Sequence, residues 1–327
     1  MKRFALLLVL MMLAVSLVSA QEKFVLKFSN VGNEKDGQSV GMMKFKEKIE
    51  ELTKGQIVCQ VYLNSSLYNQ DAATEALRKG DLEMNMTSIQ MTAEYVPELN
   101  MFAATYMFQS HDHIQAIFKG EIGKALFQRV AEKAGYLPLG AWYNGTRQLT
   151  LRTSKPIMKP EDLKGIVLRM PNTKSFVAAG ESLGAKVTPL AYSEVYTALQ
   201  TGVIDAQDNP LPSVENQKFY EVSKQICLTS HMRDAIWPAI NKKVWDRMSP
   251  DLQAKMYEAI EYGRKACDDQ NLANEAKLVD FFKSKGLIIV TPDLKAFREY
   301  AYNYYVKAGL AASWDMDLYK KIQALAK

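Results

Sequence analysis

Short apolar runs alternate with amphipathic stretches along most of the chain, and this pattern predicts strands followed by helices. The first strand is expected at 24–29, and residues 38–55 follow with apolar side chains at helical spacing and a terminal Gly55. Strands at 56–63 and 82–88, with a helix at 71–80 between them, continue the alternation. Strands that alternate with helices at this spacing predict α/β units with parallel pairing.

The alternation continues through the second half of the chain. Between residues 111 and 135 the pattern predicts two helices, and it then predicts strands at 136–142, 147–152 and 166–170, helices at 173–183 and 193–201, and a strand at 203–207. Asp208-Asn209-Pro210 is expected to form a turn at the end of this last strand. Two strands that pass between domains are predicted at 226–230 and 235–241. A late strand is predicted at 286–291, and two closing helices at 293–308 and 314–326.

One segment, 249–286, is long enough to organise more than one domain. Ser249 is suited to cap a helix and Pro250 to occupy its first position. An unbroken helix of about 36 residues would be about 54 Å long and would lie across two domains. The alternative is a pair of helices broken near Gly263 or at Asp268-Asp269.

The N-terminus has the pattern of a secretory signal peptide that is cleaved near Ala20. Lys2 and Arg3 precede an apolar run from Phe4 to Val18, and this run of about 15 residues is short for a membrane span. Removing those two residues reduces the basic count from 41 to 39 against 36 acidic residues, so the mature net charge is +3. This charge is too small to indicate nucleic-acid binding. About 300 mature residues favour two domains in an exported protein.

The residues with reactive side chains do not form a catalytic or metal-binding motif. The three cysteines are an odd number, which excludes a pure disulfide scaffold. His111 and His113 would point apart on a helix, so we expect no metal and no cofactor. The sequence also contains no common hydrolase or metalloprotease motif.

Two arginines stand out because they lie on two predicted strands, the first alternating polar and apolar residues and the second apolar except for its arginine. Arg147 begins the strand at 147–152, and Arg169 is the polar residue of the strand at 166–170. A buried guanidinium is costly unless an anion or another acceptor pairs with it, and its planar fork suits a carboxylate. These positions therefore indicate either a carboxylate-binding site or a structural salt bridge to a residue such as Asp208 or Glu215.

Four segments in this order and spacing resemble the DctP-type extracytoplasmic solute-binding proteins, which serve tripartite ATP-independent periplasmic (TRAP) transporters. They are NGTRQLT (144–150), EDLKGIVLRMPN (161–172), AYSEVYTALQTGVIDAQDNPL (191–211) and QKFYEV (217–222), and they most resemble the pattern of the sialic-acid-binding members. The resemblance implies a two-lobed α/β clamp with a long helix spanning both lobes. It assigns 21–146 plus 235–274 to lobe I and 147–234 plus 275–327 to lobe II.

The resemblance also implies the roles of individual residues. Arg169 is expected to grip the carboxylate of an organic acid, with Arg147 and Asn209 as further contacts and Tyr192 packing on the ligand. Asp208 is expected to orient Arg169. Hydrogen bonds to ligand hydroxyls are expected from Asn144, Gln70 and Ser88.

The sequence departs from the sialic-acid-binding pattern at several positions. Val31 replaces an asparagine, Asn69 and Gln70 replace an acidic pair, and Tyr192 replaces a phenylalanine. These departures disfavour sialic acid itself. The polarity of Tyr192, Asn144, Gln70 and Ser88 favours a sugar acid, such as a hexuronate or an aldonate, over an unsubstituted dicarboxylate. The alternatives are a C4-dicarboxylate or sialic-acid receptor of the same family, a receptor of an ABC transporter, and an exported enzyme acting on an acidic substrate. The expected form is a periplasmic monomer that delivers its ligand to TRAP permease subunits.

Overall fold

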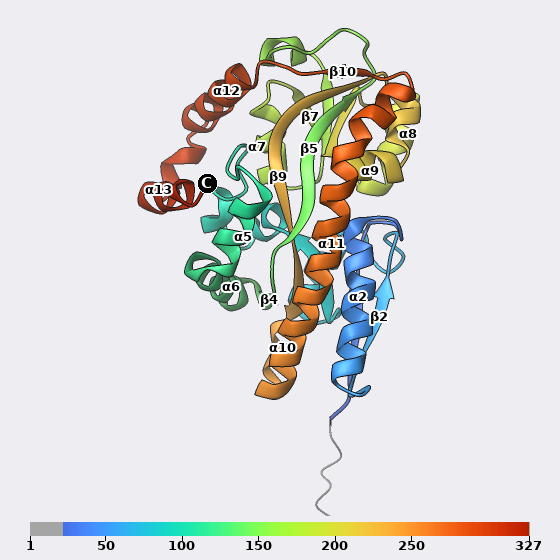
Figure 1. Cartoon of the computed structure of the whole chain (residues 1–327). Helices are drawn as coiled ribbons and strands as arrows, with labels where there is room; N and C mark the ends of the chain where they lie inside the picture. Colours follow the sequence, from blue (N-terminus) through green and yellow to red (C-terminus); the bar gives the residue numbers. More distant parts are fainter. Residues whose placement is uncertain (1–21, 327) are drawn as a thin grey trace, which may run out of the picture.

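A mixed sheet of ten strands runs through the whole molecule, and the computed structural model describes it over residues 22–326. The signal-peptide prediction for residues 1–20 lies outside the described residues. The main strand order is β2-β1-β3-β9-β5-β8-β6-β7, while β4 and β10 also pair with β9. The first three strands in this order belong to one lobe, the last three to the other, and β5 and β9 extend through both (Figure 1).

The first lobe follows the predicted alternation closely. Its strands pair in parallel, β1 with both β2 and β3, as the α/β pattern predicts. The elements are β1 (Phe24–Ser29), α2 (Gly37–Leu52), β2 (Ile57–Tyr62), α3 (Gln70–Lys79), β3 (Met84–Ser88), α4 (Ile89–Ala93), η1 (Pro97–Asn100), α5 (His111–Lys119), α6 (Glu121–Ala134) and β4 (Tyr136–Pro138). The sequence analysis did not predict α4 and η1, because their residues show little helical periodicity.

The second lobe is built from shorter elements. Its parallel strands are β8, β6 and β7, and β8 lies antiparallel to β5. The elements are β5 (Trp142–Leu151), η2 (Pro160–Leu163), β6 (Val167–Met170), α7 (Lys174–Glu181), β7 (Lys186–Pro189), η3 (Tyr192–Glu194), α8 (Val195–Thr201), β8 (Ala206–Pro210), α9 (Leu211–Asn216) and η4 (Phe219–Val222). The predicted turn at Asp208-Asn209-Pro210 is wrong, because these residues are the end of β8. Pro210 lies opposite Arg147 at the last position of that strand.

A single strand, β9 (Gln225–Asn241), replaces the two strands that were predicted for this part of the chain. The intervening HMRD segment pairs with β5, so that Arg233 lies opposite Thr146 and Asp234 opposite Gly145. β9 also lies antiparallel to β3, from Ser88↔Ile236 to Met84↔Ile240. The strand is therefore shared by the two lobes. The chain then continues through α10 (Lys242–Asp246), α11 (Pro250–Ser284), β10 (Ile288–Val290), α12 (Leu294–Lys307), η5 (Leu310–Ser313) and α13 (Met316–Ala324).

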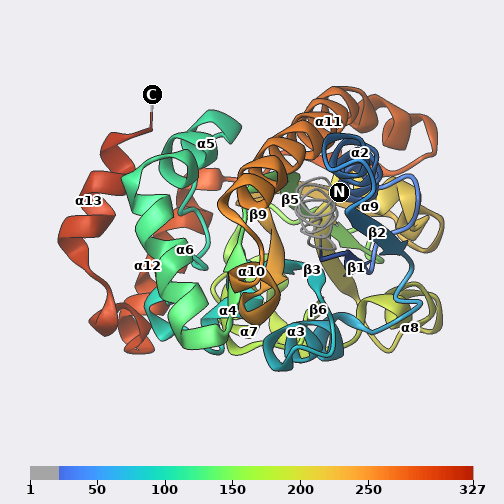
Figure 2. The same cartoon turned by 90° about the horizontal axis from the view of Figure 1, so that it is seen from below.

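The long predicted helix is confirmed as α11, one helix of 35 residues that runs along both lobes (Figure 1). Ser249 caps it by accepting a hydrogen bond from the Leu252 amide at 3.3 Å. Gly263 does not break the helix but lets it approach α2, since a Cβ at that position would lie 2.6 Å from the Gly41 carbonyl oxygen. Helices α2 and α11 therefore pack side by side, as Figure 2 shows.

Three side chains of α11 hold the backbone of β5 where that strand passes between the lobes. Asp268 accepts a hydrogen bond from the Tyr143 amide at 2.7 Å, and Asn271 donates to the Tyr143 carbonyl at 2.8 Å. Glu275 accepts hydrogen bonds from the Thr146 amide and from the Tyr143 hydroxyl. Burial raises the pKa of the Glu275 carboxyl. The acidic pair at 268–269 does not interrupt the helix.

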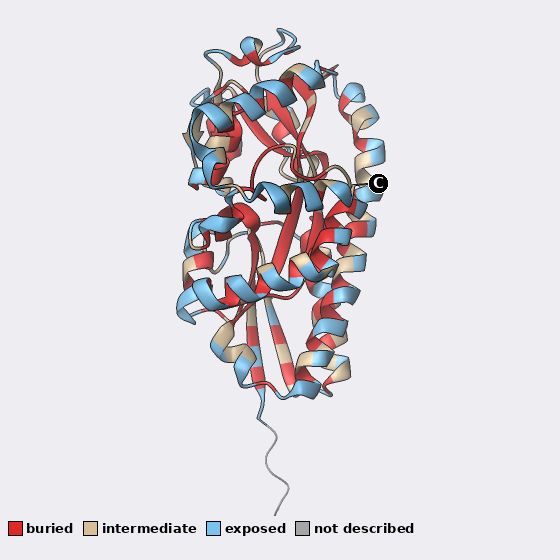
Figure 3. Cartoon of the chain, turned by 90° about the vertical axis from the view of Figure 1, so that its left-hand side faces the viewer, coloured by how far each residue is buried: buried red, intermediate tan, exposed pale blue. Residues whose placement is uncertain are grey.

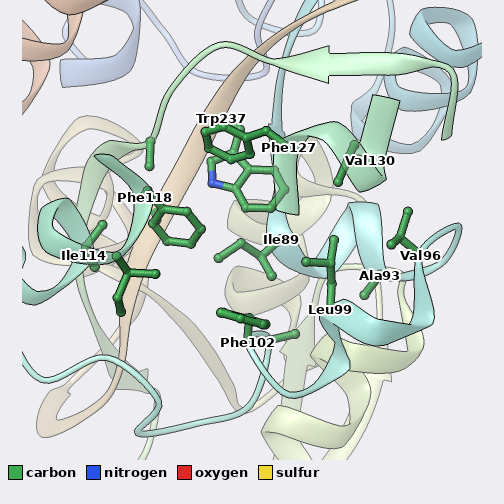
Figure 4. Close-up of a cluster of buried hydrophobic side chains, with 14 of the residues drawn as sticks. Ile89, Ala93, Val96, Leu99, Phe102, Ile114, Phe118, Phe127, Val130 and Trp237 are labelled. Carbon is green, nitrogen blue, oxygen red and sulfur yellow. The ribbon is translucent and has the colours of Figure 1, made fainter. Parts of the chain in front are cut away.

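The buried side chains form several clusters that follow the two lobes, with exposed helical faces outside them (Figure 3). In the first lobe, Trp237 of β9 packs against Phe118 and Phe127 with ring centroids 5.6 and 5.2 Å apart (Figure 4). Ile322 of α13 belongs to the same cluster, and its carbonyl oxygen lies 2.7 Å from Nε2 of His113. The proposed lobe boundaries remain a prediction, and these contacts favour moving α13 from lobe II to lobe I.

Two further properties of the described residues bear on the class of protein. None of their helices is both long and apolar enough to cross a membrane. Cys59, Cys227 and Cys267 are all buried free thiols.

Candidate ligand-binding site

A cavity of about 60 Å³ lies where the two lobes meet, at the carboxyl ends of several parallel strands. Four neighbouring strands of the sheet each contribute a polar side chain to its wall: Asp234 from β9, Arg147 from β5, Asn209 from β8 and Arg169 from β6. The carboxyl ends of strands in open α/β sheets are where ligands bind. All seven residues predicted to contact a ligand line this cavity: Arg169, Arg147, Asn209, Tyr192, Asn144, Gln70 and Ser88.

Arg147 is held by two carboxylates of the protein itself. Its Nε donates to Asp208 Oδ2 at 2.6 Å, and its Nη1 donates to Asp234 Oδ2 at 2.8 Å. Its Nη2 donates to Asp208 Oδ1 at 3.0 Å and to Asn209 Oδ1 at 3.3 Å. The guanidinium is 4% exposed, yet its charge is compensated from two neighbouring strands. The structural salt bridge to Asp208 that the sequence left open is therefore present.

Asp208 has a different role from the predicted one, because it hydrogen-bonds Arg147 and not Arg169. The register explains this: Arg169 lies opposite Gln207, so the next residue of β8 points to the other face of the sheet. Nε2 of His231 lies 3.2 Å from Asp208 Oδ2. Burial opposes ionisation of Asp208, but Arg147 and His231 outweigh it and hold the pKa of that carboxyl well below its ordinary value.

Arg169 is as deeply buried as Arg147 but has no carboxylate partner among residues 22–326. The residue is 1% exposed, and its Nε donates to the Leu190 carbonyl oxygen at 2.8 Å. Its Nη2 is buried and has no hydrogen-bond partner in the described part of the chain. Burial lowers the pKa of Arg169 to about 10, although the nearby Asp208 partly offsets this effect. An uncompensated guanidinium that faces a cavity is suited to bind an anion.

Tyr192 and Asn209 flank Arg169. The Arg169 guanidinium carbon lies 5.8 Å from the centre of the Tyr192 ring, a cation–π contact that helps to fix both side chains. Asn209 donates from Nδ2 to Gln207 Oε1 at 2.6 Å, which leaves one N–H of the amide for another acceptor. Both residues line the same cavity as Arg169.

The other three predicted residues line the cavity with partly occupied polar groups. Asn144 donates from Nδ2 to Asp234 Oδ2 at 3.0 Å. Ser88 caps α4 by accepting a hydrogen bond from the Met91 amide at 3.2 Å, so its hydroxyl proton remains available. Gln70 is the first residue of α3, and the preceding Asn69 is the cap of that helix, accepting from the Ala72 amide at 2.9 Å.

Among the polar residues of the cavity wall that sequence reasoning missed are Asp234, Gln38 and Thr87. Each is at most 7% exposed, and each carries an oxygen with no hydrogen-bond partner in the described part of the chain: Asp234 Oδ1, Gln38 Oε1 and Thr87 Oγ1. Asp234 lies in the polar HMRD segment, between the two apolar runs that were predicted as strands. It was overlooked because the HMRD segment read as a polar connection between two strands.

The arrangement offers donors and acceptors but no metal site or catalytic pair. No cluster of potential metal ligands is found in residues 22–326. His111 lies against Asp268, at 2.9 Å from its Oδ2, and His113 accepts from the Gln109 amide at 3.1 Å. The two histidines are thus engaged separately, away from the cavity. What the cavity can do chemically is bind a small molecule that carries an anionic group and hydroxyls.

Comparisons with known proteins identify a family for this chain. The family model of the bacterial extracellular solute-binding proteins, family 7, matches residues 28–309. The sialic acid-binding periplasmic protein SiaP of Vibrio cholerae is 32% identical to this chain over 253 residues, covering 77% of this chain and 78% of that protein.

Solved structures with the same fold include two TRAP periplasmic solute-binding proteins from Roseobacter denitrificans. One, with bound 3-deoxy-D-manno-oct-2-ulosonic acid, gives a TM-score of 0.88 at 38% identity, covering 93% of this chain and 100% of that one. The other, with bound L-galactonate, gives a TM-score of 0.84 at 30% identity, covering 94% of this chain and 99% of that one.

Proposed function

This chain belongs to the bacterial extracellular solute-binding proteins of family 7, the periplasmic receptors of TRAP transporters, and from that premise we propose that it binds a sugar acid through Arg169. Members of this family are receptors and not enzymes. The proposed ligand is an organic acid such as a hexuronate or an aldonate, which the protein delivers to the membrane permease. We further propose that the receptor acts as a monomer.

The observation that carries this proposal is the unpaired guanidinium of Arg169. Burying a charge without a partner costs several kcal/mol, and a bound carboxylate would remove that cost. Both acceptor oxygens of a carboxylate match the fork of donors on arginine. Asn209 and Tyr192 would complete the contact on either side, since both line the cavity next to Arg169.

The reported relatives support a sugar acid as the ligand class. Sialic acid, L-galactonate and 3-deoxy-D-manno-oct-2-ulosonic acid each combine one carboxylate with several hydroxyls. Sialic acid itself is disfavoured, because Val31 and Gln70 line the cavity where the sialic-acid pattern has an asparagine and an acidic residue. A C4-dicarboxylate is the alternative within the same family, and it would use the same arginine.

A thermal-shift comparison of three ligands tests the proposal. D-Galactonate is the sugar acid, galactitol carries a hydroxymethyl group in place of its carboxylate, and succinate is the dicarboxylate. A ligand at 100 times its dissociation constant stabilises the folded state by about 2.7 kcal/mol, which raises the melting temperature measurably. We expect a shift with galactonate and none with galactitol.

The outcomes separate the parts of the proposal. A shift with galactitol and none with either acid would show that the carboxylate role of Arg169 is wrong. A larger shift with succinate than with any sugar acid would retain Arg169 and replace the sugar acid by a dicarboxylate. Light scattering coupled to size exclusion, with and without galactonate, would test the monomer.

A further inference from the structure

The carboxylate of Asp234 has one fully used oxygen and one free oxygen. Oδ2 accepts hydrogen bonds from Arg147 Nη1 at 2.8 Å and from Asn144 Nδ2 at 3.0 Å. Oδ1 is buried, has no hydrogen-bond partner in the described part of the chain, and belongs to a residue that lines the cavity and is 4% exposed. The contacts to Oδ2 fix the side chain, so the free oxygen is held in position.

A buried acceptor without a donor is costly, so this oxygen is suited to a donor that the ligand brings. An ionised carboxylate can only accept hydrogen bonds. The group opposite Asp234 must therefore donate, as a hydroxyl does and a second ligand carboxylate does not. The oxygens Gln38 Oε1 and Thr87 Oγ1, which also lie in the wall without partners in residues 22–326, extend this acceptor-rich surface.

The charges around the cavity also favour a ligand with one carboxylate over a dicarboxylate. Arg147 and Arg169 supply two positive charges, and Asp208 and Asp234 supply two negative charges, so these four residues sum to zero. One ligand carboxylate brings the sum to −1, whereas a dicarboxylate brings it to −2. Like charges enclosed in a site of low dielectric constant repel strongly, so the second carboxylate is disfavoured.

We propose that Asp234 is the specificity-determining residue of this receptor: its Oδ1 accepts a ligand hydroxyl and rejects a second carboxylate, so the ligands are monocarboxylic hydroxy acids. The inference rests on the proposed function and deepens it, because Arg169 alone would hold mono- and dicarboxylates equally well. Arg169 then provides affinity for acids as a class, and Asp234 chooses among them.

The test uses three acids with six carbon atoms and compares their dissociation constants by calorimetry. D-Galactonate has one carboxylate and hydroxyls, hexanoate has one carboxylate and no hydroxyl, and adipate has two carboxylates and no hydroxyl. We expect the wild type to bind galactonate at least about tenfold more tightly than hexanoate and adipate, the range of one hydrogen bond to a charged group.

The Asp234→Asn variant sharpens the test. Its amide oxygen can keep the contacts of Oδ2 while its NH2 group replaces the free oxygen by a donor. We expect the affinity for galactonate to fall about 10- to 100-fold and the affinity for hexanoate to change little. The affinity for adipate should improve relative to that for galactonate. Asp268→Asn is the matched control, since Asp268 is 2% exposed and lies outside the cavity. This variant should leave the ratios of the dissociation constants for the three acids unchanged.

Several results would overturn the inference. Equal affinities of the wild type for adipate and galactonate would do so without any variant, even if Asp234→Asn fails to fold. An equal loss for all three acids in Asp234→Asn would reduce Asp234 to a support of Arg147. If the wild type binds none of the acids, the proposed function is itself wrong, and that result is distinct from acid binding without selectivity.

Discussion

Arg147 and Arg169 line the same cavity and are equally buried, but their surroundings differ. Arg147 stands between Asp208 and Asp234, and each of its nitrogen atoms donates to a protein oxygen. Arg169 has a backbone carbonyl on one side, a tyrosine ring on another, and an Nη2 with no partner in the described part of the chain. An arginine side chain therefore stabilises the fold at position 147, and at position 169 it is available to bind a ligand.

The difference shows that burial of a charge does not by itself identify a binding site. Arg147 is compensated within the folded chain, and its charge stabilises the junction of β5, β8 and β9. Arg169 gains a directly hydrogen-bonded carboxylate only when an anion enters. The informative observation is therefore the missing partner, and the predictions below test whether the two arginines can be separated in this way.

The largest expected effect is on stability and concerns Arg147. Replacing it by methionine, which keeps much of the volume, would leave Asp208 and Asp234 as buried carboxylates without their cation. We expect the free energy of unfolding to fall by about 3–5 kcal/mol, the usual result of breaking a buried ion pair on one side. Urea denaturation measures it, and a variant as stable as the wild type would contradict the structural role of Arg147.

The matched variant Arg169→Met should affect binding and leave stability almost unchanged. Truncating one partner of a buried charged pair costs about 2–5 kcal/mol, so the dissociation constant for galactonate should rise at least about 30-fold. Removing an unpaired buried charge should not lower the free energy of unfolding. Calorimetry and urea denaturation on the same sample check both statements. A change in affinity below about threefold would show that Arg169 is not the carboxylate contact.

Asp36 is a third buried charged residue, and its hydrogen-bond partners are neutral amides. It extends the comparison, with a smaller expected effect on the free energy of unfolding. Asp36 Oδ1 accepts from Asn216 Nδ2 at 2.8 Å, and Oδ2 accepts from the Asn33 amide at 2.8 Å. Burial raises the pKa of Asp36 from 3.8 to about 6, although the hydrogen bond from Asn216 partly opposes the shift. A carboxyl with a raised pKa destabilises the folded state once it ionises.

The sign of the pH dependence follows from that shift. Below pH about 4 Asp36 is protonated in both folded and unfolded chains, and between pH 4 and 6 the unfolded chain loses the proton first. The stability of the wild type relative to Asp36→Asn should therefore fall by about 1–3 kcal/mol as the pH rises through this window. Urea midpoints at pH 4 and pH 7 measure this change. A constant difference between the two proteins would contradict the prediction.

Periodicity and local residue types were enough to predict much of the fold. The parallel strands β1, β2 and β3 alternate with helices in the sequence, and the long helix α11 begins with a recognisable Ser-Pro cap. The turn predicted at Asp208-Asn209-Pro210 was wrong because turn-forming residues also fit the end of a strand. The continuity of β9 could not be predicted, since its polar HMRD segment is ordered by pairing with β5, which is distant in sequence.

The candidate site shows the same division between local and long-range information. Arg169 was identifiable because a single charge interrupts an apolar strand. Of the two partners of Arg147, Asp208 was among the salt-bridge candidates, whereas the pairing with Asp234 depends on the register of β5 and β9. Asp234 was missed because its polar HMRD segment was interpreted as a connection between two strands. Local patterns thus indicated where charge is buried, and the sheet topology determined which charges remain uncompensated.

The arrangement of β9 and α13 also constrains the order in which the chain can fold. The sheet of the first lobe needs Ile236–Ile240 beside β3, about 150 residues later in the sequence, and its core includes Ile322. Contacts of such long separation slow folding and prevent the first lobe from completing as it emerges during synthesis. The chain is therefore expected to stay incompletely folded until nearly all of it is available.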